Sequence, residues 1–147
     1  MSPEKFDALV TVNFKHALFA AQMVAPLMAK AVGGSIINLG SRGWMMGVTG
    51  YPAYTATKAA MHGPTRVLAR EFGHQRIRVN TSVPGWVMTE RQVSNWVDEE
   101  SEAQIDMNQC LPGGLFPHHI ASMALFLASD ACAMCSAQNF IVDGGWG

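Results

Sequence analysis

The stretch from Ser35 to Met61, SIINLGSRGWMMGVTGYPAYTATKAAM, predicts a strand, a loop and a helix in that order. The apolar run Ser35–Leu39 is typical of a short buried strand. Glycines recur through the following loop, Gly40–Gly50. Proline is well suited to the first turn of a helix, so we expect a helix over Pro52–Gly73, with a kink where Pro64 removes a backbone hydrogen bond. This strand and helix form the basic unit of an α/β fold.

The rest of the chain repeats the alternation of helices and strands. A serine and a proline begin a long apolar helix, which should end before two consecutive glycines. The expected elements are a helix from Pro3 to about Lys30, a strand Ile77–Val83, an irregular stretch Glu90–Met107 with room for short helices, a helix His118–Ala128 and a strand Asn139–Val142. This rhythm predicts an α/β fold with a parallel sheet.

Composition limits the classes of function. The chain has 147 residues, enough for one domain, with 49% hydrophobic residues, 14% charged residues and a net charge of −1. Near-neutral charge without a basic run argues against nucleic acid as a partner. The lack of an uninterrupted apolar run of about 18 residues predicts no transmembrane helix. Three cysteines and a first segment unlike a signal peptide lead us to expect reduced thiols in the cytoplasm.

Tyr54 and Lys58 are the first candidates for chemistry. A spacing of four residues puts both side chains on one face of the expected helix. A neighbouring ammonium group favours the phenolate, so Lys58 should move the pKa of Tyr54 down from about 10 toward working pH. Such a tyrosine can exchange a proton with a hydroxyl or a carbonyl group. The alternative is two unrelated residues on a helix surface.

Three segments are expected to converge on one edge of the sheet. Ser41 directly follows the first strand, and Pro84-Gly85 follows the second. The carboxyl ends of parallel strands line the ligand crevice in open α/β sheets. Ser41, the start of the Tyr54 helix and the Pro84 turn should therefore open onto the same rim.

Several other features have competing interpretations. Asn13 lies within an apolar helix face, where it is either a functional polar group or a tolerated solvent-facing residue. The loop Gly40–Gly50 contains glycines but no G-x-G-x-x-G pattern, so a substrate-pocket wall is favoured over a phosphate-binding loop. Cys132 and Cys135 form a C-x-x-C pair that could serve redox or metal chemistry, although no second pair exists and we predict no metal site.

The chain resembles the carboxyl-terminal half of the short-chain dehydrogenase/reductase family, essentially from end to end. Tyr54 and Lys58 match the family's Y-x-x-x-K pair, and Tyr54 follows Ser41 by 13 residues, the usual spacing. The other matching motifs are Val12-Asn13-Phe14, Ile77-Arg78-Val79-Asn80, Pro84-Gly85 with Thr89, Phe126-Leu127-Ala128-Ser129-Asp130 and Val142-Asp143-Gly144-Gly145. The resemblance implies part of a Rossmann-like, doubly wound parallel sheet, with about three strands and flanking helices.

The resemblance also implies catalytic roles. Tyr54 would be the general acid and base, and Lys58 would lower its pKa and bind the nicotinamide ribose. Ser41 would hold the substrate oxygen, and Asn13 would anchor a water molecule in a proton relay.

Cofactor and substrate contacts follow from the same resemblance. Besides Tyr54 and Lys58, the cofactor NAD or NADP would be bound by Pro84, Gly85, Val87 and Thr89. Ser41, Tyr54 and Trp86 would face the substrate. The segment from Pro84 to Gln92 and the ending Asp143–Trp146 look like those of sugar 1-dehydrogenases of the galactose or fucose type, which oxidise an aldose at C1. The implied partners are a small alcohol or sugar and a second copy of the chain, packed through the two long helices.

The departures from the family are as informative as the matches. Residues 1–147 would be a single partial domain without the amino-terminal half, which carries the glycine fingerprint and the residue that chooses NAD or NADP. The strand Ser35–Leu39 would then become an exposed edge. We therefore expect an oxidoreductase that is inactive or impaired in this form. The alternative is a non-catalytic fragment that acts as a dimerisation or interaction module, and a thiol or metal protein is a more distant alternative.

Overall fold

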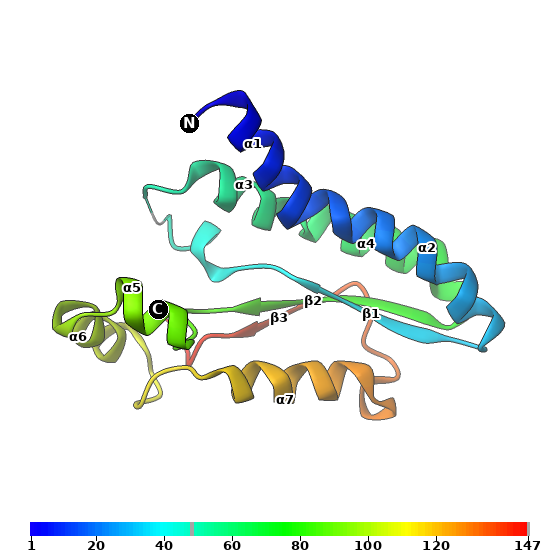
Figure 1. Ribbon diagram of the computed structural model, residues 1–147. Helices are drawn as coiled ribbons and strands as arrows, with labels where there is room; N and C mark the ends of the chain where they lie inside the picture. The colour runs from blue at the N-terminus through cyan, green and yellow to red at the C-terminus, as the bar shows by residue number, and fades with distance from the viewer. Residues whose placement is uncertain (48, 147) are drawn as a thin grey trace.

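Three parallel strands form the centre of the structure, with helices on both faces (Figure 1). The computed structural model describes residues 1–47 and 49–146. The strands are β1 (Gly34–Leu39), β2 (Ile77–Pro84) and β3 (Asn139–Val142), in the order β1-β2-β3. Both neighbouring pairs are parallel, with Ile36 opposite Val79 and Val83 opposite Ile141. The expected α/β fold with a parallel sheet is confirmed.

The helices form two layers. Helices α2 (His16–Lys30) and α4 (His62–Phe72) pack on one face of the sheet, and α7 (Pro117–Ala128) packs on the other (Figure 1). The remaining helical elements are α1 (Pro3–Val10), η1 (Thr11–Lys15), η2 (Arg42–Trp44), α3 (Pro52–Ala60), η3 (Gly73–Gln75), α5 (Glu90–Trp96), α6 (Glu99–Asn108) and η4 (Asp130–Cys132). Helices α5 and α6 occupy most of the stretch that was expected to be irregular.

The first long helix runs from Pro3 to Lys30, as expected, but its middle is a π-helix. In this segment, η1, the backbone N–H of His16 donates to the carbonyl of Thr11, five residues earlier. Within η1, the side-chain amide of Asn13 donates to the carbonyl of Leu9 at 3.1 Å. A side chain that occupies a backbone acceptor competes with the regular helical bond. Asn13 therefore favours the wider turn, which the apolar periodicity does not reveal.

Val32, rather than a glycine, adopts the first left-handed conformation after this helix, with φ of 65°. Its N–H donates to the carbonyl of Ala29, and the N–H of Gly33 donates to that of Met28. These two bonds cap the last turn of α2. The expectation of an end before Gly33 is confirmed, although a β-branched residue takes the position that glycine usually fills.

Pro64 divides the predicted helix Pro52–Gly73 into α3 and α4. A proline clashes with the carbonyl group four residues earlier. That residue is Ala60, the last residue of α3, so the division occurs where the steric conflict requires it. The predicted kink corresponds to an interruption at the single residue Met61, whose backbone keeps helical angles, with φ of −60° and ψ of −24°.

A buried hydrogen-bond network centred on Thr65 holds this break against the sheet. The Thr65 hydroxyl donates to the carbonyl of Met61 at 2.8 Å and accepts from the Asn38 side-chain amide at 2.8 Å. The hydroxyl groups of Thr65 and Thr81 lie 2.7 Å apart. With Thr81 as donor, Thr65 uses one donor and two acceptor positions, its full capacity. The network therefore joins β1, β2 and α4 without an unpaired group at its centre.

The strand β2 is the most buried element. Val79, Thr81 and Val83 are each 0% exposed, and Ile77 is 1% exposed. Ala25 of α2 and Ala69 of α4 pack against Ile77 and Val79. The small alanines let both helices approach the strand closely, which makes this layer the main apolar core.

The helix Pro3–Lys30 has 28 residues and enough apolar character, by length and composition alone, to cross a membrane. Core helices of soluble proteins can have the same length and composition. In this fold, α1 packs on α3, and α2 packs on β1 and β2.

Replacing Thr65 with valine should destabilise the fold while preserving its shape. The change leaves the Asn38 amide and the Thr81 hydroxyl buried without their shared partner, at a cost of about 1–3 kcal/mol for each group. We expect Thr65→Val to lower the free energy of unfolding by about 3 kcal/mol in urea denaturation. Thr11→Val, at an exposed position, is the matched control and should change it little. Equal stability of the two variants would contradict the importance of the network.

Candidate active site

The predicted site residues gather around the carboxyl ends of the strands. Strand β1 ends at Leu39, β2 at Pro84 and β3 at Val142. Figure 1 shows α5, α6 and the carboxyl-terminal segment grouped at this edge, with α3 on the other side of the ends of the strands. The prediction that Ser41 and the Pro84 turn follow the ends of neighbouring strands agrees with this arrangement.

Tyr54 and Lys58 lie one turn apart on α3. The Lys58 ammonium group is 5.8 Å from the centre of the Tyr54 ring. The Tyr54 side chain is 37% exposed, so its hydroxyl can be reached from solvent. The Thr57 hydroxyl donates to the Tyr54 carbonyl at 2.7 Å and adds a bond within the same turn. A cation near an accessible phenol is compatible with general acid and base catalysis.

Lys58 also connects α3 to the sheet. Its ammonium group donates to the carbonyl of Leu39 at 3.1 Å, at the last residue of β1 and two residues before Ser41. Partial burial lowers the pKa of Lys58 from its ordinary value of 10.5. One of its three protons is used by Leu39, and two remain available to a ligand.

Ser41 is the N-cap of the short turn η2. Its hydroxyl oxygen accepts a hydrogen bond from the N–H of Gly43 at 3.2 Å, and its backbone is extended, with φ of −160°. The hydroxyl proton is not used by this cap, so it can be donated to a substrate oxygen. Turn η2 packs against α3, so Ser41 is held on an element that adjoins the helix carrying Tyr54. The predicted loop Gly40–Gly50 also includes Val48, which lies outside the described residues.

Asn13 lies on an element that also packs against α3, the helix that carries Tyr54. It belongs to η1, which packs against α3. Its amide nitrogen is bound to the Leu9 carbonyl, and its side chain is half-buried. The amide oxygen is the part of this side chain that can accept a hydrogen bond from a water molecule.

The segment after β2 closes another side of the site. The N–H of Gly85 donates to the carbonyl of Val142 at 2.9 Å, and Val87 pairs with Leu115 in an isolated parallel bridge. Thr89 is the N-cap of α5, and its hydroxyl oxygen accepts from the N–H of Gln92 at 3.2 Å. The segment of predicted cofactor contacts is therefore fixed at both ends, by β3 and by α5.

Trp86 lies in the middle of this segment. Its indole nitrogen is buried and has no hydrogen-bond partner among the described residues. A buried N–H without a partner is unfavourable. That Trp86 faces a substrate stays a prediction.

Sequence reasoning missed the side chains that hold the Ser41 turn. Arg42 makes a salt bridge to Asp143 at 2.8 Å, and the indole N–H of Trp44 donates to the His62 ring at 3.0 Å. Asp143 was known only as part of a family motif. The residues of the salt bridge are 101 positions apart, so no spacing pattern could have indicated it.

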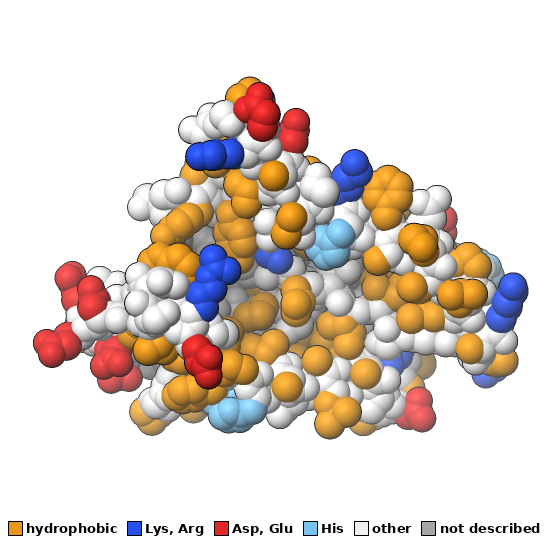
Figure 2. Space-filling view, in the orientation of Figure 1, with side chains coloured by type: hydrophobic (Ala, Val, Ile, Leu, Met, Phe, Trp, Pro, Cys, Tyr) orange, Lys and Arg blue, Asp and Glu red, His pale blue; other side chains and the backbone are white. Residues whose placement is uncertain are grey.

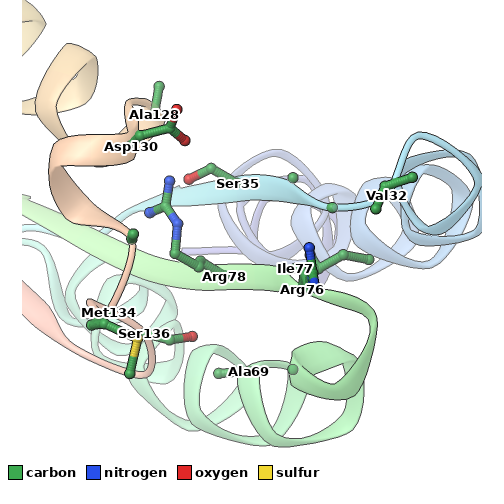
Figure 3. Close-up of a pocket in the computed structure, with 14 residues that line it drawn as sticks. Val32, Ser35, Ala69, Arg76, Ile77, Arg78, Ala128, Asp130, Met134 and Ser136 are labelled. Atoms are coloured by element: carbon green, nitrogen blue, oxygen red, sulfur yellow. The ribbon is translucent and has the colours of Figure 1, made fainter.

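A hollow of about 770 Å³ lies at the opposite edge, among the amino ends of the strands (Figure 3). Two of its polar residues, Ser35 and Arg78, bind backbone carbonyls. Arg78 donates to the carbonyls of Leu127 and Ser129, and the Ser35 hydroxyl donates to that of Leu127. These bonds satisfy the last carbonyls of α7. The candidate catalytic residues are not among those that line this hollow.

Cys132 has a different environment from a reactive thiol. Cys132 is buried, and burial raises the pKa of its thiol. A raised pKa disfavours the thiolate, which is the form that attacks disulfides or binds metals. Within residues 1–47 and 49–146, no group of three or more His, Cys, Asp or Glu side chains is placed to hold a metal ion. The C-x-x-C pair therefore gives no support to the thiol or metal interpretation.

Known relatives cover nearly all of the chain. A family model described as enoyl-(acyl carrier protein) reductase matches residues 1–147. The D-xylose 1-dehydrogenase of Caulobacter vibrioides is 45% identical over 141 residues, which are 96% of this chain and 56% of the relative. A probable galactose dehydrogenase of Rhizobium meliloti is 41% identical over 145 residues, or 99% of this chain and 57% of the relative. The chain thus spans little more than half the length of these relatives.

The fold also has close structural counterparts among solved structures. A putative NAD(P)-dependent gluconate 5-dehydrogenase from Beutenbergia cavernae, with bound NADP, matches with a TM-score of 0.91 and 31% sequence identity. The match covers 99% of this chain and 59% of that structure. Family model, relatives and fold agree with one another: the chain belongs to the short-chain dehydrogenase/reductase family of oxidoreductases.

Proposed function

We propose that this chain is the catalytic part of an NAD(P)-dependent dehydrogenase that oxidises a sugar, at C1 of an aldose, or a similar small alcohol. The observation that carries the proposal is the position of Lys58. Its ammonium group lies beside the Tyr54 ring and donates to the last carbonyl of β1, the strand that leads into Ser41. One side chain thus lies beside Tyr54 and binds the end of the strand that leads into Ser41.

The proposed mechanism assigns one task to each side chain. The Ser41 hydroxyl donates to the substrate oxygen and orients the carbon that reacts. Tyr54, as phenolate, removes the hydroxyl proton, and the positive charge of Lys58 stabilises the phenolate while it does so. Asn13 holds a water molecule through its free amide oxygen and so connects the site to solvent. In the direction of reduction, Tyr54 returns the proton.

The nicotinamide cofactor, when bound, supplies the acceptor for the hydride. Lys58 has free N–H donors for its ribose, and the hydroxyl proton of Thr89 is free for a phosphate oxygen. The turn Pro84-Gly85 and Val87 lie between these groups along the chain. Residues 1–147 contain no G-x-G-x-x-G pattern for the pyrophosphate, so these residues match the nicotinamide end of the cofactor.

A sugar is favoured over other alcohols by the relatives and by Trp86. The two relatives described above are named for xylose and galactose. The apolar face of an indole ring can pack against a sugar ring. In the family, the choice between NAD and NADP depends on residues in the amino-terminal half, which residues 1–147 do not match.

A homo-oligomer formed through the two long helical segments, α1–α2 and α3–α4, is part of the proposal. Large apolar side chains are exposed on these helices, and Figure 2 shows hydrophobic side chains over α2. They include Phe6, Val12, Phe19, Met23, Leu27 and Val67. Clustered exposed apolar groups favour contact with another protein surface. The three cysteines are free, in keeping with the cytoplasmic location that we propose.

A non-catalytic interaction module is the second candidate. In the order β1-β2-β3, the outer edge of β1 has no strand partner among the described residues. Leu39 on this strand is 52% exposed. An open strand edge readily pairs with another chain. Turnover by a chimera that supplies the amino-terminal half distinguishes the dehydrogenase from the interaction module.

Catalysis by Tyr54 can be tested in a chimera that joins the unmatched amino-terminal part of the Caulobacter relative to residues 1–147. We expect sugar-dependent reduction of NAD⁺ or NADP⁺, tested with D-xylose and D-galactose. Tyr54→Phe should lower kcat by about a hundredfold or more and leave cofactor affinity nearly unchanged. Tyr51→Phe, an identical change at a residue that is 55% exposed, is the control and should retain activity. Substantial turnover by Tyr54→Phe would refute the assigned role.

Cofactor binding by residues 1–147 alone should be weak or absent, because they contain no pyrophosphate fingerprint. The measurement is a fluorescence titration of the purified chain with NADH. The chimera serves as the positive control. Saturable binding at micromolar concentrations by the 147-residue chain would show that this expectation is wrong.

Lys58 should titrate below 10.5, since burial disfavours its charged form. Between its lowered pKa and 10.5, the unfolded chain binds a proton that the folded chain has lost, so this group makes the fold more stable as pH rises through that window. The measurement is the pH dependence of the Lys58 Cε resonance by NMR. Lys58→Met identifies the resonance by its disappearance. A midpoint at or above 10.5 would contradict the effect of burial.

A further inference from the structure

Arg42 directly follows Ser41 and binds the carboxyl-terminal segment. Its Nε donates to Oδ2 of Asp143 at 2.8 Å, and a terminal nitrogen donates to the carbonyl of Trp146 at 2.8 Å. The Arg42 side chain is 21% exposed and that of Asp143 is 8% exposed. A charged pair with this little exposure is screened far less than a surface pair. Arg42 thus ties the Ser41 turn to a segment about a hundred residues away.

Asp143 also touches the turn on the other side of the site. Its second oxygen, Oδ1, accepts from the N–H of Gly145 at 2.9 Å. A Cβ atom on Gly85 would lie 2.7 Å from Cβ and 2.9 Å from Cα of Asp143, which means that the Gly85 backbone packs directly on this residue. Asp143 therefore lies between the turn that carries Ser41 and the turn that contains Gly85.

Before the Ser41 turn, the N–H of Gly40 donates to the carbonyl of Ser82 in β2 at 2.8 Å, so the backbone that leads into Ser41 is also held on the sheet. Within the turn, Ser41 caps Gly43, and the N–H of Met45 donates to the carbonyl of Arg42 at 2.9 Å. These are local bonds and do not fix the turn relative to the sheet. The bond from Trp44 to His62 connects it to the start of α4. Arg42 is the side chain that connects Ser41 to the predicted nicotinamide side.

We propose that Arg42 is a positioning residue: through Asp143 it fixes the Ser41 hydroxyl relative to the Gly85 turn, so that the substrate side and the nicotinamide side of the site are held as one unit. This inference rests on the proposed function for its catalytic meaning. A loss of the salt bridge leaves a buried carboxylate without its charge partner, and the turns on both sides of Asp143 lose their common anchor. A substrate oxygen held by Ser41 would then vary in position relative to the hydride acceptor, which lowers the rate of transfer.

The test is amide hydrogen exchange of the 147-residue chain, measured by NMR. In Arg42→Met, the amides of Gly43 and Met45 and those of Gly85 and Gly145 should exchange about tenfold faster or more, while Val79 in the centre of β2 keeps its rate. Arg42→Lys restores the charge but not the paired N–H groups, so it should recover part of the protection. Arg66→Met, which removes an exposed arginine of α4, is the matched control and should leave all five amides unchanged.

Each outcome has a definite meaning. Faster exchange at both turns with partial recovery in Arg42→Lys supports the proposal. Unchanged exchange at Gly85 overturns it, because the two turns are then independent. An equal increase at Val79 also overturns it, because the effect is then a general loss of stability. Asp143→Asn, which keeps the size of the side chain, should give the same local pattern and serves in place of Arg42→Met if that variant does not fold.

The exchange measurement needs neither substrate nor cofactor. An inactive chimera would therefore count against the proposed function and leave the role of Arg42 as a mechanical link intact. Conversely, an active chimera with independent turns would support the function and refute the link.

Discussion

The hydroxyl group of Thr65 is the interaction on which the placement of the candidate site depends. Pro64 separates α3 from α4, so the helix that carries Tyr54 and Lys58 is not held straight by the helix that follows. Thr65 restores the connection by binding Met61 at the break, Asn38 in β1 and Thr81 in β2. A small polar group thus does at this junction what continuous helical bonds do elsewhere, and its burial makes each bond costly to lose.

Two charged side chains extend this arrangement toward the reacting groups. Lys58 reaches from α3 to the end of β1, and Arg42 reaches from the Ser41 turn to Asp143. Each connects the Ser41 region to a different neighbour, one to the helix of Tyr54 and the other to the carboxyl-terminal segment. The site is therefore assembled by long side chains that bridge elements, on a sheet whose central strand is almost fully buried. Preorganisation of this kind reduces the reorganisation that a reaction must drive.

Much of the fold and of the site could be predicted from local patterns. The apolar runs identified all three strands, and proline and glycine marked the ends of the helices within a few residues. The short spacing of Tyr54 and Lys58 is a local signal, as is the position of Ser41 at the end of a strand. Features that depend on distant contacts gave no such signal: the salt bridge of Arg42, the hydrogen bond between Trp44 and His62, and the buried N–H of Trp86 arise only when the chain folds. Val32, which is 71% exposed, takes the left-handed conformation that glycine usually fills, and no pattern in the sequence indicates it.

The π-helical segment η1 has a consequence for changes in the length of the first helix. A π-helical turn closes its hydrogen bond over five residues rather than four, so it holds about one residue more than an α-helical turn. An extra residue in a regular α-helix would rotate the preceding part by about 100°, whereas the wide turn takes up most of that rotation. Helix α1 can therefore face α3 while α2 faces the sheet. Asn13, whose amide occupies the Leu9 carbonyl, holds the wide turn, so the loss of one residue should disturb the structure less within η1 than elsewhere along this helix.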